Sequence, residues 1–192
     1  MAKFPVHTAQ TAPQGSANAL AAFEKRLGFV PSLFGVFAEN PAVLDAYTTL
    51  QGFVGRSGLS PLEREVVLMT SNVENQCHFC VAAHSTMDEK AGLDMDVIYA
   101  IRDGRRIKDP RLEALRQFTR KVVIDRGFVS DGDVQAFLAS GWTKADVLAV
   151  ILGVSLKVLS NYTNHVAETP VDDAFAKHVW TPPAERTDAI VA

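Results

Sequence analysis

Apolar residues recur at helical spacing through most of this chain, and this periodicity is the feature that most restricts its fold. Val, Ile, Thr and aromatic residues almost never alternate with polar residues in the way that a half-buried strand requires. The sequence therefore predicts an all-α, multi-helical fold. Expected helices cover residues 17–27, 32–38, 41–54, 61–73, 76–91, 95–103, 110–126, 131–140 and 144–167, joined by short connections.

Capping signals support these boundaries. Ser60, Pro61 and Glu63 combine an N-cap, a first-turn proline and an acidic residue three positions after the cap, which predicts a helix that begins at Pro61. Asp109 before Pro110 and Thr143 before Asp146 predict two further starts. The expected stops are Gly92, Gly104 and Gly141.

The last predicted helix is the best candidate for the core. Residues 147–154 are apolar on all sides, which suits a helix buried among others or against another subunit. The charge-free run between Asp146 and Lys157 is about half of the ~20 residues that a bilayer-spanning helix needs, so we expect no transmembrane segment. The tail at 171–192 holds Pro182, Pro183 and several charges. It is expected to wrap the surface or a neighbouring chain rather than form core.

Charge and cysteine usage exclude several classes of partner. The net charge is -3 and no cluster of Lys and Arg occurs, so there is little electrostatic basis for binding nucleic acid or an anionic membrane. Residues 1–16 lack the apolar core of a secretory signal. Only two cysteines occur, which excludes a disulfide framework. We therefore expect a cytoplasmic protein that forms one helical domain over residues 1–192.

The two cysteines and a histidine form the constellation that carries chemistry. On a helix, Cys77, Cys80 and His84 fall within a sector of about 60°. Such a pair can close a short disulfide, and the histidine one turn beyond Cys80 can accept a thiol proton. With Asn75 as N-cap, Cys77 would lie in the first turn, where unpaired backbone N–H groups favour a thiolate. The pattern therefore favours a redox dithiol with its own base.

Other interpretations of these residues remain open. The cysteines could be small buried hydrophobic residues and the histidine a satisfied core residue. Thiolate and imidazole are also good zinc ligands, but a zinc site needs a fourth ligand and no second cysteine pair exists. A thioredoxin-like domain requires alternation of strands and helices, which this sequence lacks.

The segment around these residues resembles the alkylhydroperoxidase D-like members of the carboxymuconolactone decarboxylase family. The redox branch of that family carries a glutamate, a Cys-x-x-Cys pair and a histidine four residues after the second cysteine. This chain supplies Glu65, Cys77, Cys80 and His84 at matching spacing. The resemblance covers 59–92 and extends more loosely to the segment NYTNH at 161–165, which is similar to the closing motif of an uncharacterised peroxidase-related subgroup.

The resemblance implies an orthogonal helical bundle that assembles as trimers or hexamers, and a thiol peroxidase that needs no haem, metal or other cofactor. In the family's scheme Cys80 attacks a hydroperoxide, Cys77 resolves the sulfenic acid as a disulfide, His84 transfers the proton and Glu65 orients His84. The implied partners are hydrogen peroxide or a small organic hydroperoxide and a dithiol or thiol-protein reductant. The helix dipole favours the thiolate at Cys77 instead, but a direct proton acceptor beside Cys80 carries more weight.

One departure from the family pattern concerns the residue before the second cysteine. The founding alkylhydroperoxidase has a histidine there, whereas this chain has Phe79, with His78 one position earlier and about 100° away on the helix. His78 is therefore not expected to take the same place in a proton relay. Phe79 is expected to shape an apolar entrance for an organic hydroperoxide.

Several polar residues outside the motif are ambiguous. Asp88 lies four residues after His84, but its neighbours Glu89 and Lys90 favour a surface position. Asn161, Tyr162 and His165 end the long apolar helix, where lining a pocket, capping and packing are all open.

Three functional hypotheses follow. The first is a cysteine-based peroxidase or related dithiol oxidoreductase. The second is a lactone decarboxylase or isomerase in which Glu65 and His84 transfer protons, although the decarboxylase branch of the family generally lacks the cysteine pair. The third is a non-catalytic helical oligomer that senses redox state. Peroxide consumption that depends on both cysteines separates the first from the others.

Overall fold

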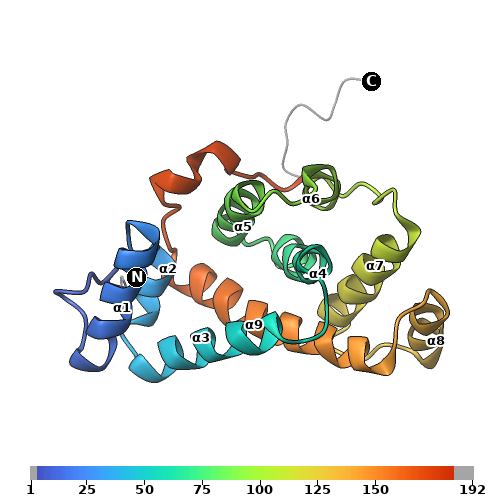
Figure 1. The fold of residues 1–192 in the computed structure, drawn as a ribbon, viewed down its shortest axis with the longest axis horizontal. Helices are drawn as coiled ribbons and strands as arrows, with labels where there is room; N and C mark the ends of the chain where they lie inside the picture. The colour runs from blue at the N-terminus through green and yellow to red at the C-terminus, as the bar shows by residue number, and fades with distance from the viewer. Residues whose placement is uncertain (1–3, 184–192) are drawn as a thin grey trace.

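The computed structural model describes residues 4–183 and shows helices joined by short connections (Figure 1). No strand occurs within those residues, so the all-α prediction is confirmed. The elements are α1 (Gln14–Leu27), α2 (Ser32–Phe37), α3 (Pro41–Gly55), α4 (Pro61–Glu74), α5 (His78–Lys90), α6 (Met95–Arg102), α7 (Pro110–Ile124), α8 (Asp131–Ala139), α9 (Lys144–Ala167) and the 3₁₀ helix η1 (Asp173–His178).

The capping signals act as predicted. Ser60 accepts from the backbone N–H of Glu63, and the Glu63 carboxylate accepts from the backbone N–H of Ser60 at 2.7 Å, which completes a capping box. Thr143 and Asp146 form the same arrangement at the start of α9. The three predicted glycine stops all adopt positive φ, a conformation that glycine reaches without a Cβ clash: Gly92 (70°), Gly104 (69°) and Gly141 (88°).

The start of α5 differs from the prediction. Asn75 ends α4 instead of capping α5, and Cys77 is the N-cap, so the helix begins at His78 rather than at residue 76. Gln76 adopts a left-handed φ of 54°, and the backbone N–H of Cys77 donates to the carbonyl of Asn72 at 2.9 Å. The chain therefore reverses direction at Gln76 before the new helix starts. Strained non-glycine backbone of this kind is concentrated at functional sites.

Helix α4 lies near the centre of the molecule, packed against α5, α6, α7 and α9 (Figure 1). One apolar cluster joins α4, α6, α7 and α8 to the first half of α9. A second cluster joins α1, α2 and α3 to α5 and the second half of α9, and it includes both cysteines. Helix α9 runs through both clusters, so it connects the redox motif to the rest of the core.

Helix α9 is apolar on all sides but not buried on all sides. Leu148 is 67% exposed and Val166 is 70% exposed, so burial among the helices of the single chain is incomplete, and burial against another subunit stays a prediction. Of the described helices, α9 alone is long and apolar enough to cross a membrane. Its inner face carries buried polar residues, among them Lys157 and Asn161, which contact α4 and α5 as in the core helix of a globular protein.

Close contact between α4 and α9 depends on a glycine. A Cβ at Gly153 would lie 2.8 Å from Cγ1 of Val67, closer than carbon atoms approach. The absent side chain lets the two helices meet one turn before Lys157, and this places Lys157 beside the motif on α4 and α5.

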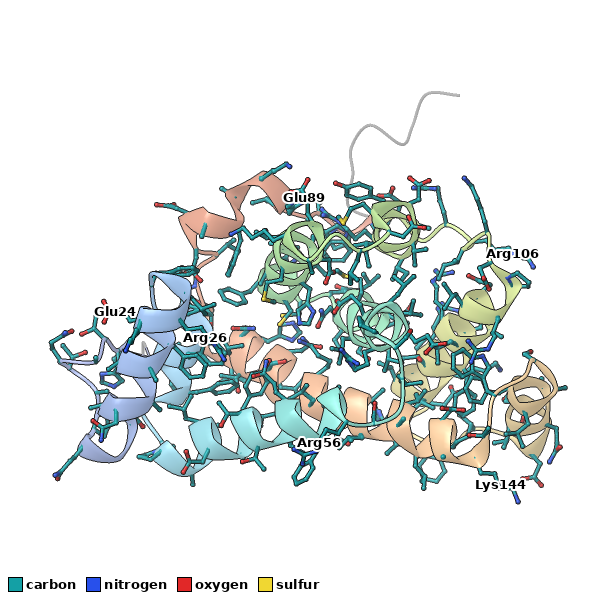
Figure 2. All side chains as sticks on the ribbon, viewed as in Figure 1. Glu24, Arg26, Arg56, Glu89, Arg106 and Lys144 are labelled. Carbon is teal, nitrogen blue, oxygen red and sulfur yellow. The ribbon has the colours of Figure 1, made fainter. Side chains whose placement is uncertain are left out.

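The C-terminal segment contributes to the core, contrary to the prediction. Phe175 and Trp180 are 5% and 3% exposed, and each joins one of the two apolar clusters. The helix η1 packs along α5 beside Glu89, which Figure 2 labels. Lys177 and His178 of η1 contact the Glu89 carboxylate. Two large aromatic side chains therefore outweigh the charges and prolines of the tail. The last part of the predicted tail, 184–192, lies outside the described residues.

Candidate active site

The structure brings together the four residues that the motif predicts. Glu65 comes from α4, Cys77 from the N-cap of α5, and Cys80 and His84 from successive turns of α5. The cysteines are 1% and 2% exposed and both are free thiols. Nδ2 of Asn164 lies within hydrogen-bond distance of both sulfurs, so the two thiols are close to one another. The two sulfurs are therefore placed for disulfide formation.

The two thiols differ in acidity. Burial opposes ionisation of Cys80, but the hydrogen bond from Cys77 and the charge of Lys157 hold the pKa of Cys80 well below its usual value. The hydrogen bond to Cys80, together with burial, raises the pKa of Cys77. Cys80 is thus the thiolate of the pair.

The helix dipole favours the same cysteine. Because Cys77 is the N-cap, Cys80 occupies the third helical position, within the first turn. The sequence expectation placed Cys77 inside the first turn, whereas the structure places it at the N-cap, where its side chain makes no capping hydrogen bond. The dipole and the neighbouring charge both stabilise a thiolate at Cys80.

Lys157 is a site residue that the sequence interpretation missed. It lies on α9, is 1% exposed, and its Nζ is 2.9 Å from Nε2 of His84. Burial alone would lower the pKa of Lys157, but the neighbouring acids, Cys80 first, raise it above its usual value. Lys157 is therefore charged. The signal in the sequence is that it is the only Asp, Glu, Lys or Arg between Asp146 and Glu168.

His84 is neutral and held from both sides. Burial and the charge of Lys157 lower its pKa to about 4. The Lys157 ammonium has only protons to donate, so Nε2 of His84 accepts from it. Nδ1 then carries the proton and donates to Oε1 of Glu65 at 2.7 Å. The sequence interpretation has His84 accept the thiol proton. In the structure the lone pair of Nε2 is occupied by Lys157.

Asp88 is buried, contrary to its predicted place on the surface. It is 5% exposed and lies close to Glu65, while its neighbours Glu89 and Lys90 are exposed. Burial raises the pKa of Glu65 to about 8. Burial and the nearby Glu65 raise the pKa of Asp88 to about 8 as well. Both carboxyl groups are therefore largely protonated at neutral pH.

Side-chain amides from α9 contact the other side of the thiols. Nδ2 of Asn164 lies 3.2 Å from the sulfur of Cys80 and 3.6 Å from that of Cys77. Asn161 also hydrogen-bonds Cys80 and is held by Asn72 and Asn75 of the α4 end. Of the residues whose roles were left open, Asn161 therefore lies in the site. Tyr162 and His165 are exposed and lie outside it.

A cavity of about 210 Å³ opens onto Cys80, His84 and Lys157. Phe79 lines it as expected and packs edge-on against Phe175, with ring centroids 5.8 Å apart. The remaining wall is largely apolar and includes Phe29, Leu33, Phe34, Ala83 and Met87. The thiolate thus faces a space that suits a small apolar molecule.

His78 points away from this cavity. Its Nδ1 lies 2.9 Å from the carbonyl oxygen of Trp180, and its ring packs against the Trp180 ring. His78 is not among the residues that line the cavity. Its contacts therefore agree with the expectation that it stays outside a proton relay. Within residues 4–183 no group of three or more His, Cys, Asp or Glu side chains could hold a metal ion.

Comparisons with known proteins give a family match and several similar folds. Residues 41–120 match the model of the carboxymuconolactone decarboxylase family. The fold is similar to the alkylhydroperoxidase AhpD core of an uncharacterized peroxidase-related protein from Ralstonia eutropha JMP134, at 25% identity and a TM-score of 0.77 over 94% of this chain and 97% of that one. No curated protein matches the sequence.

Two other solved structures share the fold at lower identity. One is an uncharacterized peroxidase-related protein from Silicibacter sp. TM1040, with 18% identity and a TM-score of 0.76 over 91% of this chain and 92% of that one. The other is a variant of the debrominase Bmp8 in complex with 2,3,4-tribromopyrrole, with 13% identity and a TM-score of 0.76 over 93% and 96%. The fold is therefore shared by a debrominase and by proteins described only as peroxidase-related.

Proposed function

We propose that this chain, in which residues 41–120 match the model of the carboxymuconolactone decarboxylase family, is a cysteine-based peroxidase with the dithiol Cys77–Cys80 as its redox centre. The observation that carries the proposal is the asymmetry of the pair. Cys80 lines the cavity beside Lys157, whose charge favours a thiolate there, whereas Cys77 is not part of the cavity wall and its pKa is raised.

The reaction consists of two steps at sulfur. The Cys80 thiolate attacks the terminal oxygen of a hydroperoxide, so an S–O bond forms, the O–O bond breaks, and the alkoxide leaves and is protonated to the alcohol. Cys77 then attacks the sulfenic acid, which forms the disulfide and releases water. A dithiol or a thiol protein returns both cysteines to the reduced state and is itself oxidised.

The cavity supports a small hydroperoxide as substrate. Its aromatic and aliphatic wall favours an apolar organic group, and Phe79 and Phe175 form part of that wall. Hydrogen peroxide also fits a space of about 210 Å³. Both free thiols suit a reducing compartment, and we accordingly propose a cytoplasmic location.

Proton transfer on a small lactone is the second candidate. It is favoured by the buried chain of Lys157, His84 and Glu65, whose groups can carry a proton without the cysteines. In that case, substitution of either cysteine would leave activity unchanged. Dependence of turnover on Cys80 therefore separates the two functions.

The test is single-turnover reduction of cumene hydroperoxide and of hydrogen peroxide by the reduced protein. Cys80→Ser should abolish the reaction, whereas Cys77→Ser should react once and stop at a sulfenic acid on Cys80, which a dimedone-type probe traps. Turnover with dithiothreitol should require both cysteines. A wild-type protein that consumes neither peroxide, or a Cys80→Ser protein that still consumes them, would overturn the proposal.

A further inference from the structure

The buried ammonium of Lys157 has no part in the mechanism written so far. It lines the cavity together with Cys80 and His84, and only 1% of the residue is exposed. A charge at such a depth is costly unless nearby groups compensate for it, so its surroundings indicate what it does.

We propose that Lys157 is a catalytic residue of this site: its ammonium group pairs with the Cys80 thiolate and delivers the proton that leaves with the alkoxide. His84 and Glu65 are then positioning residues that hold the ammonium in place. This inference rests on the peroxidase function proposed above.

The charged and titratable groups around Lys157 support the pairing. They come from three helices packed against α9: Tyr47 from α3, Glu65 from α4, and Cys77, Cys80, His84 and Asp88 from α5 and its N-cap. The short helix α2 also packs against α9 but carries no titratable side chain. Burial holds Tyr47 neutral by raising its pKa, and His84 is neutral. Glu65 and Asp88 are largely protonated, because burial raises the pKa of each to about 8. Of these groups, the Cys80 thiolate is the only negatively charged one that lines the cavity together with Lys157.

His84 cannot perform the task in this arrangement. Its Nε2 accepts from Lys157, and its Nδ1–H is directed at Glu65, so neither nitrogen has a proton or lone pair to offer the cavity. With a pKa of about 4, the His84 ring is neutral at pH 7 and has no additional proton to donate. Lys157 has three N–H groups and uses one on His84, which leaves protons for the substrate.

A proton cycle through Lys157 balances. When Cys80 attacks, the O–O bond breaks and Lys157 gives its proton to the departing alkoxide, which leaves an alcohol, a sulfenic acid and a neutral amine. Cys77 and the sulfenic acid then form the disulfide and water, with no net change at the amine. After a dithiol reduces the disulfide, the Cys80 thiol returns its proton to the amine. The thiolate and ammonium are thereby restored.

Three variants test the proposal in the reduced full-length protein. Lys157→Met removes the charge, Lys157→Arg keeps the charge but cannot release a proton near neutral pH, and Lys144→Met removes an exposed lysine at the far end of the same helix as a control (Figure 2). Two quantities are measured. One is the pH dependence of iodoacetamide alkylation of Cys80, located by peptide mapping, which reports its thiolate fraction. The other is the single-turnover rate with cumene hydroperoxide.

In Lys157→Met, the alkylation midpoint of Cys80 should move to higher pH, and peroxide reduction at pH 7 should slow by about 10²-fold or more. In Lys157→Arg, the alkylation midpoint should stay low, while peroxide reduction should still slow by at least about tenfold because the proton donor is lost. Lys144→Met should match the wild type in both measurements.

Each result that contradicts these expectations has a defined meaning. An unchanged alkylation profile in folded Lys157→Met would overturn the ion pair, and an unchanged peroxide rate in Lys157→Arg would overturn proton delivery. Circular dichroism checks that each variant folds. If Lys157→Met does not fold, the peroxide rate of Lys157→Arg alone tests proton delivery. A wild type that reduces no peroxide, together with a shifted Cys80 profile in Lys157→Met, would refute the peroxidase function and retain the pairing.

Discussion

The side-chain amide nitrogen of Asn164 lies 3.2 Å from the sulfur of Cys80, across a span of 84 residues of sequence. The same nitrogen is 3.6 Å from Cys77, so one amide group on α9 contacts both thiols at the N-terminus of α5. Asn164 is largely buried, and its Oδ1 has no hydrogen-bond partner. The amide is therefore oriented by its contacts with sulfur.

Asn164→Leu should weaken the thiolate. A hydrogen bond to a charged group contributes about 1.5–3 kcal/mol, so its loss should raise the pKa of Cys80 and slow alkylation of Cys80 at pH 7 by roughly tenfold or more. The measurement is the iodoacetamide rate at Cys80. His165→Ala, which changes the exposed neighbour, should leave that rate unchanged. Equal rates in Asn164→Leu and the wild type would mean that the contact does not stabilise the thiolate.

Cys77 and Cys80 should form a reversible intramolecular disulfide. Both thiols are free in the structure and hydrogen-bonded to one another. Stoichiometric hydrogen peroxide should therefore remove both thiols from an alkylation count, and dithiothreitol should restore them. Two thiols that stay fully alkylatable after peroxide treatment would exclude redox cycling at this pair.

The raised pKa values of Glu65 and Asp88 should make stability depend on pH. In the folded chain both pKa values, about 8, lie above the ordinary values of 4.5 and 3.8, so the folded state holds the two protons more tightly. The stability this supplies is complete below about pH 4 and is lost as pH rises toward 8. The lowered pKa of His84 acts in the opposite direction, with stability lost as pH falls from 6.5 to about 4.

Between pH 6.5 and 8 each carboxyl group that keeps its proton in the folded chain lowers stability by up to about 1.4 kcal/mol per pH unit. The Cys80 thiolate acts in the opposite direction there, because its pKa lies below that of an unfolded cysteine. Asp88→Asn removes one carboxyl contribution and leaves Cys80 in place, so its stability should fall less, or rise more, across this range than that of the wild type. Urea unfolding at several pH values measures the effect. Asp45→Asn, an exposed substitution on α3, serves as the control. The same slope in Asp88→Asn and the wild type would contradict the raised pKa of Asp88.

Gly153→Ala should destabilise the fold although alanine ordinarily favours a helix. Its Cβ would meet Cγ1 of Val67 at 2.8 Å, and overpacking of this kind costs about 1–3 kcal/mol. Gly52→Ala in α3 has no atom within 4 Å of the new Cβ and should instead stabilise by about 0.5–1 kcal/mol. Chemical denaturation of both variants gives the comparison. A stabilised Gly153→Ala protein would show that α4 and α9 are not in close contact.

We expect the chain to assemble into a symmetric oligomer, with a trimer or hexamer as the expected form. The outer face of α9 exposes Leu148 and Val166. Phe128, in the connection between α7 and α8, is 90% exposed. Exposed apolar area of this kind favours association. Multi-angle light scattering gives the mass directly. A monomer at micromolar concentration would contradict the expectation.

Local chemistry determined most of the helical framework. The Ser60–Glu63 and Thr143–Asp146 capping boxes involve residues three apart, so their contacts form whatever the rest of the chain does. The spacing of Cys80 and His84 on α5 is likewise set by helix geometry. The boundary before α5 was misplaced because the left-handed turn at Gln76 belongs to no glycine or asparagine, the residues that signal such turns.

Only the tertiary structure decided the charges of the site. Lys157 meets His84 across 73 residues of sequence, and its place on an apolar helix gives no indication of which groups face it. Asp88 has the same local pattern as its exposed neighbours and is buried because α4 lies against that face of α5. The pKa values of Cys80, His84 and Glu65 depend on burial and on charges from other helices. Sequence spacing thus identified which residues can react, whereas the packing of α4, α5 and α9 set which of them carry charge.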